Sequence, residues 1–479
     1  MAYFPLDLGK QSNKGKSPQE GVARLINCRA ESAGEEQRVQ YPLHTVAGLD
    51  PLGTLSGTGG VRALIEVDGT GYAVAGRVVH QFESGGTSFS LGGMPSDGFL
   101  SMARNYRPSG AQTMIVCDGL AKYIEAGTLR EIDDPDVGLP NSVTYAQGHF
   151  VTGGTDGYLR ASEINDASQW DAFDATRGPD GLIRVEARGS SIVAFGEAAF
   201  QVWDYTGSAT EFPFQLVHTS RVGCYSAGSV VTATIIRPDL VSDVIVWCST
   251  DHTGAYAGVV MLDGYTARKI STHSVDRDVM RATSASTITS CAYVENGHAY
   301  IAITIPDVTT WVYDTATGLW HERQSKGLDH WVIAATCTLT GRIVGGHRTL
   351  PKLYWVDPDT HDEDGDELTV TLQPPPVNAF PDQLEINELH LDCVTGVGLN
   401  TTTPANLDPT VMMQTSYDGE TWGTELSRAL GRQGQTRKLI AWHGLGTTDH
   451  RGVSFRFRVS AACVRTFMRA RISGNKVAQ

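Results

Sequence analysis

The sequence predicts an all-β protein: a β-propeller of about seven blades followed by a small C-terminal β-sandwich. Helical periodicity is nearly absent, whereas short runs of β-branched and aromatic residues recur between Gly, Asp and Asn turns. Several short strands repeated about every 40 to 50 residues are typical of a propeller, in which each blade buries its faces against its neighbours. Comparable units begin at Val61, Ser101, Ser142, Arg184, Val230, Thr289 and Trp331.

The composition indicates a globular chain without membrane spans. Of the 479 residues, 41% are hydrophobic and 19% are charged. No uninterrupted apolar run approaches the ~18 residues that cross a bilayer. The 52 glycines and 20 prolines favour many tight turns. We therefore expect no insertion into a membrane.

The chain divides into four predicted segments. Residues 1–30 are expected to form an N-terminal arm, in which residues 21–28 (GVARLINC) supply a ring-closing strand to the final blade. The propeller is expected over residues 31–360. An acidic and proline-rich linker over residues 361–383 then leads to the sandwich, for which residues 384–479 supply about five alternating strands.

Charge is unevenly spread along the chain. The formal net charge is −15, and residues 384–479 carry 11 Lys and Arg against 8 Asp and Glu, so this region is +3 and the remainder is −18. An acidic body opposes nonspecific attraction to phosphate backbones. Two differently charged regions are therefore expected.

The eight cysteines are expected to be reduced and mostly buried in strands. Each lies more than 20 residues from the next, so no pair has the spacing of a metal or redox site. The N-terminus lacks a basic region followed by an apolar one, so no secretory signal is expected.

No motif predicts a catalytic, cofactor or metal site. The glycines of residues 9–17 (GKQSNKGKS) are six apart where a phosphate-binding loop requires five, and no strand precedes them. His321 and Glu322 begin a zincin-like motif, but Ser325 stands where its second His is required. The acidic run of residues 357–367 places threonine at the first and last ligand positions of a calcium loop. We therefore expect no enzyme activity.

The last strands predict one arginine-rich face of the sandwich. Strand alternation places the arginines of RTFMRAR together with Phe467 on one side, and the arginines of FRFRV also share a side. Such a face is either a solvated outer surface or a contact with a partner protein or a DNA backbone. The candidate assembly interface consists of Arg456, Arg458, Arg465, Arg469 and Arg471.

Several stretches together point to one known family. The central one is residues 178–214 (GPDGLIRVEARGSSIVAFGEAAFQVWDYTGSATEFPF), and others are residues 25–28 (LINC), residues 415–423 (TSYDGETWG) and the arginine-rich last strands. In their order, the chain resembles the tail-hub proteins of short-tailed bacteriophages, also called packaged-DNA stabilisation or head-completion proteins. The resemblance covers residues 25–472 and rests on order and strand pattern.

The resemblance implies a non-enzymatic structural protein of the virion tail, assembled in the cytoplasm of the bacterial host. It implies a homo-hexameric ring below the portal adaptor protein that extends the DNA channel and retains the packaged genome. Tailspikes or tail fibres and a central needle or plug would be carried by this ring. DNA would pass without sequence-specific contacts, and an acidic propeller body would let it slide rather than adhere. We place the arginine face in an assembly interface.

A carbohydrate-binding or glycan-cleaving propeller is the alternative. It would need an aromatic floor and convergent carboxylates at one mouth of the propeller. Trp170, Trp203, Trp247 and Trp311 are spread over different units, so we expect them to fill the core instead.

Overall fold

The computed structural model describes residues 2–17, 20–34, 39–208, 211–237, 240–251, 253 and 257–477. The chain forms two compact units, which we call the ring unit and the sandwich unit. In the described residues both units are built from strands, with two short helices, α1 (His273–Met280) in the ring unit and α2 (Pro404–Leu407) in the sandwich unit. The all-β prediction is confirmed. The ring unit comprises Asp50–Val308 and Val332–Val356, and the sandwich unit comprises Met1–Leu49, Thr309–Trp331 and Asp357–Gln479.

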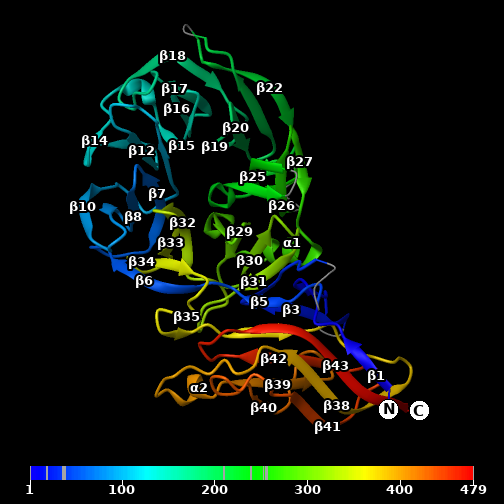
Figure 1. Ribbon diagram of the computed structural model, residues 1–479. Helices are drawn as coiled ribbons and strands as arrows, with labels where there is room; N and C mark the ends of the chain where they lie inside the picture. Colours follow the sequence, from blue (N-terminus) through cyan, green and yellow to red (C-terminus); the bar gives the residue numbers. More distant parts are fainter. Residues whose placement is uncertain are drawn as a thin grey trace. The chain divides into compact units, whose positions relative to one another are not determined.

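Four antiparallel four-stranded sheets begin the ring unit, and in each the strands pair with their neighbours in the chain (Figure 1). They are β7 (Val61–Val67), β8 (Thr70–Ala75), β9 (Val78–Phe82) and β10 (Ser88–Gly93); β11 (Leu100–Arg104), β12 (Gln112–Cys117), β13 (Leu120–Glu125) and β14 (Thr128–Glu131); β15 (Pro140–Ala146), β16 (His149–Gly154), β17 (Tyr158–Ser162) and β18 (Trp170–Arg177); β19 (Leu182–Arg188), β20 (Ser191–Gly196), β21 (Phe200–Tyr205) and β22 (Phe214–Ser220).

A five-stranded sheet, a hairpin and a final sheet complete the ring unit. The five strands are β23 (Gly223–Cys224), β24 (Val231–Arg237), β25 (Leu240–Thr250), β26 (Ala257–Asp263) and β27 (Thr266–Lys269). The hairpin is β28 (Thr289–Glu295) and β29 (His298–Ile305), and the final sheet holds β32 (Ile333–Leu339), β33 (Arg342–His347), β34 (Lys352–Asp357) and residues 50–54 of β6 (Gly48–Thr54).

Two-residue turns explain why neighbouring strands pair. Asp68 and Gly69 between β7 and β8 have φ of 50° and 83°, and Asn296 and Gly297 between β28 and β29 have φ of 50° and 81°. Two successive positive φ angles define the type I′ turn, whose twist matches that of paired strands and which Asp-Gly and Asn-Gly favour.

Seven inner strands form the ring. The strands β7, β11, β15, β19, β24, β28 and β32 lie at the inner edge, and β32 contacts β7, so the ring closes within this unit. Figure 1 labels β7, β15, β19 and β32 among them. The junction of β19 and β24 carries a hydrogen bond from Thr232 Oγ1 to Glu186 Oε1 of 3.3 Å. These inner strands confirm the predicted seven-bladed propeller.

The strand that completes the final sheet is not the one predicted from sequence. Residues 50–54 pair with β34, and Leu55 N donates to Pro351 O at 2.7 Å just beyond them. Residues 21–28 were assigned this role but instead contain β3 (Val22–Ile26), which belongs to the sandwich unit. The buried side chain of Leu25 packs there in the sandwich core.

Aromatic side chains fill the space between neighbouring sheets. Trp247 of β25 packs edge-on against Phe195 and Phe200 of the fourth sheet, with ring centroids 5.0 and 5.4 Å apart. The predicted core role is confirmed for four tryptophans, which are all buried: Trp170, Trp203, Trp247 and Trp311.

The sandwich unit has two sheets around one core. Apolar side chains from both sheets meet in this core, among them Leu389, Trp442, Val411 and Phe457. The first sheet contains β4 (Cys28–Ala30), β5 (Leu43–Thr45), β43 (Thr466–Val477), β38 (Gln383–Cys393), β41 (Ile440–Thr447) and β1 (Ala2–Leu6). The second contains β30 (Thr309–Asp314), β31 (Trp320–Arg323), β3, β37 (Val370–Gln373), β42 (Ser454–Val459), β39 (Thr410–Ser416), β40 (Leu426–Ala429) and β2 (Asn13–Lys14). The short pair β35 (Asp362–Glu363) and β36 (Asp366–Glu367) also lies in this unit.

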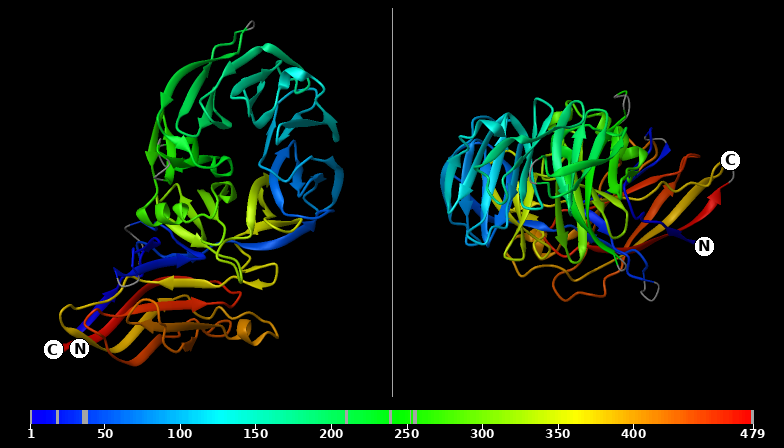
Figure 2. Two further views of the ribbon diagram at one scale, coloured as in Figure 1. Left: turned by 180° about the vertical axis from the view of Figure 1, so that it is seen from behind. Right: turned by 90° about the horizontal axis from the view of Figure 1, so that it is seen from above.

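Both ends of the chain build this sandwich. The segments expected to be an arm and a linker contain sandwich strands, since β37 pairs with both β3 and β42 and its Val370 and Leu372 are fully buried. Strand β1 pairs with β43 from Ala2 opposite Gly474 to Leu6 opposite Ala470. The two termini therefore lie side by side (Figure 2).

A buried carboxylate holds β2 and β3 against β31. Glu322 is fully buried and accepts from Arg24 Nε (3.0 Å) and Arg24 Nη2 (2.6 Å), while Lys14 Nζ lies 3.1 Å from its Oε2. Thr309 Oγ1 donates to the same carboxylate at 3.2 Å. Although burial alone would raise the pKa of Glu322, the Arg24 and Lys14 cations outweigh it and lower the pKa to about 2. The carboxylate is thus charged at neutral pH.

Replacing Glu322 by Gln should loosen β3 and β31. The substitution leaves two cations without their shared carboxylate, so we expect the local free energy of opening to fall by about 3 to 5 kcal/mol. Hydrogen exchange of β3 and β31 amides measures this loss. In Glu425→Gln, which removes the exposed partner of Arg458, the cost should be under ~1 kcal/mol. Equal losses in the two variants would contradict the prediction.

His321 should make the same region sensitive to acid. Burial, reinforced by the Arg29 cation, lowers the pKa of this imidazole to about 3. Because the unfolded chain binds a proton below pH ~6.5 that the folded chain excludes, stability is full above that pH and is lost on acidification, by about 2 kcal/mol at pH 5. Glu322 stays ionised in this window. Hydrogen exchange of β31 at pH 7 and pH 5, corrected for intrinsic rates, should show this loss in the wild type and a much smaller one in His321→Gln; identical losses would exclude His321 as the cause.

Candidate functional site

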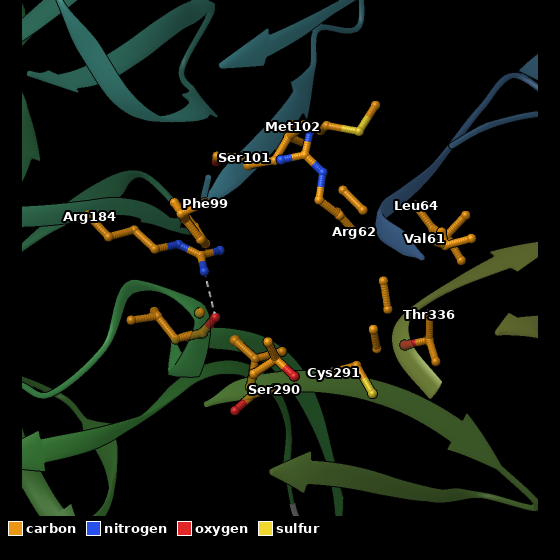
Figure 3. Close-up of a pocket in the computed structure, with 18 of the residues that line it drawn as sticks. Val61, Arg62, Leu64, Phe99, Ser101, Met102, Arg184, Ser290, Cys291 and Thr336 are labelled. Carbon is orange, nitrogen blue, oxygen red and sulfur yellow. Dashed lines mark hydrogen bonds between the residues drawn. The ribbon is translucent and has the colours of Figure 1, made fainter. Parts of the chain in front are cut away.

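The centre of the ring unit holds a cavity of about 610 Å³, to which all seven inner strands contribute (Figure 3). Its walls come from residues of each inner strand and from loops beside these strands. Prominent lining residues are Arg62, Phe99, Ser101, Arg184, Ser290, Thr336 and Arg348.

Arg62 and Arg184 fasten neighbouring sheets at the cavity wall. Arg62 of β7 donates to the carbonyls of Ser96 (3.0 Å) and Gly98 (2.6 Å), which lead into the second sheet. Arg184 of β19 donates through Nη1 to two carbonyls of the fifth sheet's leading loop, one of them Val230 O at 2.8 Å, and through Nη2 to Glu186 at 2.7 Å. Both side chains are thus engaged in protein contacts.

Side-chain hydroxyl groups make hydrogen bonds to backbone groups at the unpaired edges of the inner strands. Ser101 Oγ of β11 donates to Val143 O at 2.9 Å and accepts from Val143 N at 3.2 Å. Thr144 Oγ1 of β15 accepts from Ala187 N at 2.9 Å, and Thr336 Oγ1 of β32 donates to Ala292 O at 2.8 Å. Buried backbone groups need such partners. The inner strands β15, β19 and β28 therefore rely on side chains of a neighbouring strand.

The chemistry of this cavity does not favour the glycan-cleaving alternative. Among the described residues that line it, Phe99 is the single aromatic side chain, and its ring lies 5.3 Å from the Arg184 guanidinium. Its two carboxylates are occupied, because Glu186 pairs with Arg184, and Asp97 accepts from Arg77 at 3.0 Å. Neither an aromatic floor nor a free pair of carboxylates is present in this lining.

Sequence reasoning missed the three arginines of the cavity. Two of them, Arg62 and Arg184, stand near the start of the first and fourth repeats, but the hairpin registers align Arg184 with Ala63 and not with Arg62. Arg348 lies in the loop after β33, where no repeat pattern marks it.

The five candidate interface arginines do not share one face. Arg456 and Arg458 lie on β42 in the second sheet of the sandwich, whereas Arg469 and Arg471 lie on β43 in the first. The core occupies the space between these sheets, so the two pairs point outward on opposite sides. The prediction of a single arginine-rich face is therefore wrong.

A register shift also alters the predicted alternation in β43. The pairing with β38 shifts between Asp392 and Cys393, so that Asp392 faces Arg469 and Cys393 faces Phe467. Phe467 is consequently buried in the core and is not beside the arginines.

Arg465 is a structural residue of the sandwich interior. It is 3% exposed, and it donates to Leu368 O at 2.5 Å and to His361 O at 2.9 Å. Burial lowers the pKa of Arg465 to about 10, which still leaves it charged at neutral pH. Arg465 is therefore too buried to belong to the candidate assembly interface.

The other four arginines remain at the surface of the sandwich unit. Arg456 donates to Gln414 Oε1 at 2.6 Å and stacks 4.1 Å from the Trp422 ring. Arg469 Nε donates to Asp392 Oδ2 at 2.9 Å. Arg458 Nη1 lies 3.5 Å from Glu425 Oε1, and the side chain of Arg471 is exposed to solvent.

Cysteines and candidate metal ligands form no site in the described parts of the chain. All eight cysteines are free thiols; seven are buried and Cys337 is partly buried, which confirms the predicted burial. Burial raises the pKa of Cys28, Cys224 and Cys248 to about 12, so these thiols stay protonated. No three His, Cys, Asp or Glu side chains of the described residues converge as metal ligands. The described helices are also too short to cross a membrane.

Comparison with known proteins matches both parts of the chain. The family model described as "Bacteriophage P22 Gp10, beta-propeller" matches residues 30–361, and that described as "Bacteriophage P22 Gp10, beta-sandwich" matches residues 377–475. No curated protein matches significantly. Similar solved structures include the WD40 β-propeller domain of Doa1 (12% identity over 64% of this chain and 97% of that chain, TM-score 0.40) and the designed protein Ika8 (15% identity over 70% and 100%, TM-score 0.38).

Arg465 and Arg471 should differ sharply on substitution. Arg465→Ser leaves two buried carbonyls without their donor, and we expect a loss of about 2 to 4 kcal/mol. Arg471→Ser, on the surface of the same unit, should change stability by no more than ~0.5 kcal/mol. Scanning calorimetry of the full chain should show a lower Tm for Arg465→Ser alone. If Arg465→Ser melts like the wild type, the interior role is refuted.

Proposed function

Since the chain belongs to the family of bacteriophage P22 Gp10, the tail-hub or packaged-DNA-stabilisation proteins, it is a phage structural protein, and we propose that it forms the tail hub of a short-tailed virion. In this proposal six copies assemble below the portal adaptor protein as a ring that extends the DNA channel and retains the packaged genome. The proposed ring carries tailspikes or tail fibres and a central needle or plug.

The observation that carries this proposal is the paired match of the propeller and sandwich models. They cover residues 30–361 and 377–475 in the family's order. The seven-bladed ring and the two-sheet sandwich have the architecture that both models describe. A match to a propeller alone would fit many unrelated functions.

The charge distribution supports a passage for DNA. The ring unit carries 19 Lys and Arg against 29 Asp and Glu, a net charge of −10, which opposes adhesion of a phosphate backbone. Arg62 and Arg184, two cations of the ring unit, are turned to its interior and engaged with protein oxygens. DNA is therefore proposed to slide past the subunits without sequence-specific contacts.

Four arginines at the surface of the sandwich unit, of which Arg471 is exposed and the others are partly buried, are our candidates for the assembly interface. Arg469 and Arg471 lie on one outer face, and Arg456 and Arg458 lie on the other. Arginine suits such contacts because its planar guanidinium makes paired hydrogen bonds to carboxylates. A subunit with such faces on both sides of one sandwich has the geometry to contact two neighbours.

We propose a non-enzymatic role in the virion tail, with assembly in the host cytoplasm. The central cavity supports this role, because its two carboxylates are each paired with an arginine and Phe99 is the single aromatic residue of its described lining.

Particles made without this chain should package DNA and then lose it. We expect full-length DNA retained in heads to fall at least tenfold, and electron microscopy to show no tail below the adaptor. Complementation with Arg469→Ser/Arg471→Ser tests the first outer face, with Arg437→Ser as an exposed control. Stable DNA-filled particles with an intact tail but failed adsorption would overturn the hub proposal and favour the carbohydrate-binding alternative.

A further inference from the structure

One arginine of the central cavity lacks the partners that the other two have. Arg348 follows β33, and its backbone N donates to Val332 O at 2.7 Å. Its Nη2 donates to Thr289 Oγ1 at 2.7 Å, with Ile333 O at 3.5 Å. The structure pairs Arg348 with no carboxylate among the described residues, and its Nε is buried without a hydrogen-bond partner.

Close backbone contact with Gly60, in the loop before β7, holds the backbone of Arg348 in place. A Cβ at Gly60 would lie only 1.7 Å from Arg348 O, so the loop before β7 and the loop after β33 touch through their backbones. The guanidinium is therefore anchored at its root and by its bond to Thr289, which limits its freedom to turn toward bulk solvent.

Partial burial leaves this cation with hydrogen bonds to neutral groups alone, from Nη2 to Thr289 Oγ1 and Ile333 O. It lowers the pKa of Arg348 to about 10, which keeps the side chain charged at neutral pH. A charge taken out of water is costly unless an opposite charge or several hydrogen bonds replace the solvent. Arg184, by contrast, has Glu186 beside it, and Arg62 has three carbonyl acceptors.

A second polar group in the same wall also lacks a partner. Ser290 Oγ is buried and makes no hydrogen bond, and Ser290 lines the cavity together with Thr289 and Arg348 (Figure 3 labels Ser290). Buried hydroxyls normally have a partner in the protein or in a bound molecule. The unmatched groups are thus a cation and a hydroxyl, the combination that binds an oxyanion.

From these observations we propose that the central cavity binds a small organic oxyanion, whose phosphate or carboxylate group sits on Arg348 and Ser290. A volume of about 610 Å³ exceeds what one inorganic ion fills and lies within the ordinary range of small-molecule sites. The hydroxyls of Thr232 and Thr336 donate their protons to Glu186 and Ala292, but their oxygens can still accept hydrogen bonds from the polar body of such a ligand. This site is separate from the proposed assembly role.

Calorimetric titration of the purified full chain tests the proposal, with inorganic phosphate and acetate as probes at constant ionic strength set by chloride. We expect saturable binding of at least one probe, and the stronger probe identifies the head group. Arg348→Gln should weaken binding by about tenfold or more, because a hydrogen bond to a charged group is lost. Arg342→Gln is the matched control on the same sheet, since its guanidinium stacks on Trp355 away from this wall, and it should bind like the wild type.

Ser290→Ala keeps the test decisive if Arg348→Gln fails to fold. This small change should weaken binding by about threefold to tenfold. Absence of saturable binding by both probes would overturn the proposal, as would unchanged affinity in Arg348→Gln or, where that variant does not fold, in Ser290→Ala. Such a failure leaves DNA retention by the virion unaffected, so it is distinguishable from failure of the tail-hub proposal.

Discussion

The free edges of the seven inner strands set the main constraint on the ring unit. An inner strand pairs on one side only, so its other backbone groups face a confined cavity and must find acceptors and donors there. Side chains of the adjacent strand meet this need, as Ser101 does for Val143 and Thr144 for Ala187. Backbone groups at the inner edge of one sheet thus obtain hydrogen bonds from the next sheet, so neighbouring sheets stabilise one another. Arginine performs the same task where the leading loops leave carbonyls behind, as at Val230.

The sandwich unit solves a different problem, since its strands come from opposite ends of the sequence. Strand β37 requires both β3 and β42 as partners, and β43 requires β1, β5 and β38. Because β3 and β37 are separated by more than 340 residues, as in the pair Ile26 and Thr371, the loop between them must be closed by strong local contacts. Asn27 contributes such contacts by donating to the carbonyls of Gln324 (2.8 Å) and Thr369 (2.9 Å). The buried Glu322 carboxylate adds ion pairs with Lys14 and Arg24, which also hold β2 and β3 to β31.

Local pattern in the sequence was enough to predict strands, turns, seven repeats and the buried tryptophans, because these depend on residues close together in the chain. Long-range pairing was not predictable in this way. The closing strand lies at residues 50–54 rather than 21–28, since both segments have strand character and only tertiary partners decide between them. The prediction of one arginine-rich face was wrong for the same reason. Alternation fixes which residues of one strand share a side, but not which sheet the strand joins. Arg465 then turned inward because the carbonyls of His361 and Leu368 lacked a donor.

These features also bear on how the arginines of this chain fit the proposed passage of DNA. Arginines normally attract phosphate, yet here several are committed to protein oxygens before any partner arrives. Arg62 and Arg184 hold neighbouring sheets, and Arg323 donates to Ala47 O at 2.7 Å with its guanidinium 3.7 Å from the Trp331 ring. Interior cations satisfied in this way stabilise the fold without offering donors to a passing backbone, while the acidic side chains keep the surface repulsive to phosphate. For the proposed tail hub, rigidity and low adhesion therefore come from the same placement of arginine: inward, against the carbonyl groups that the sheets leave unpaired.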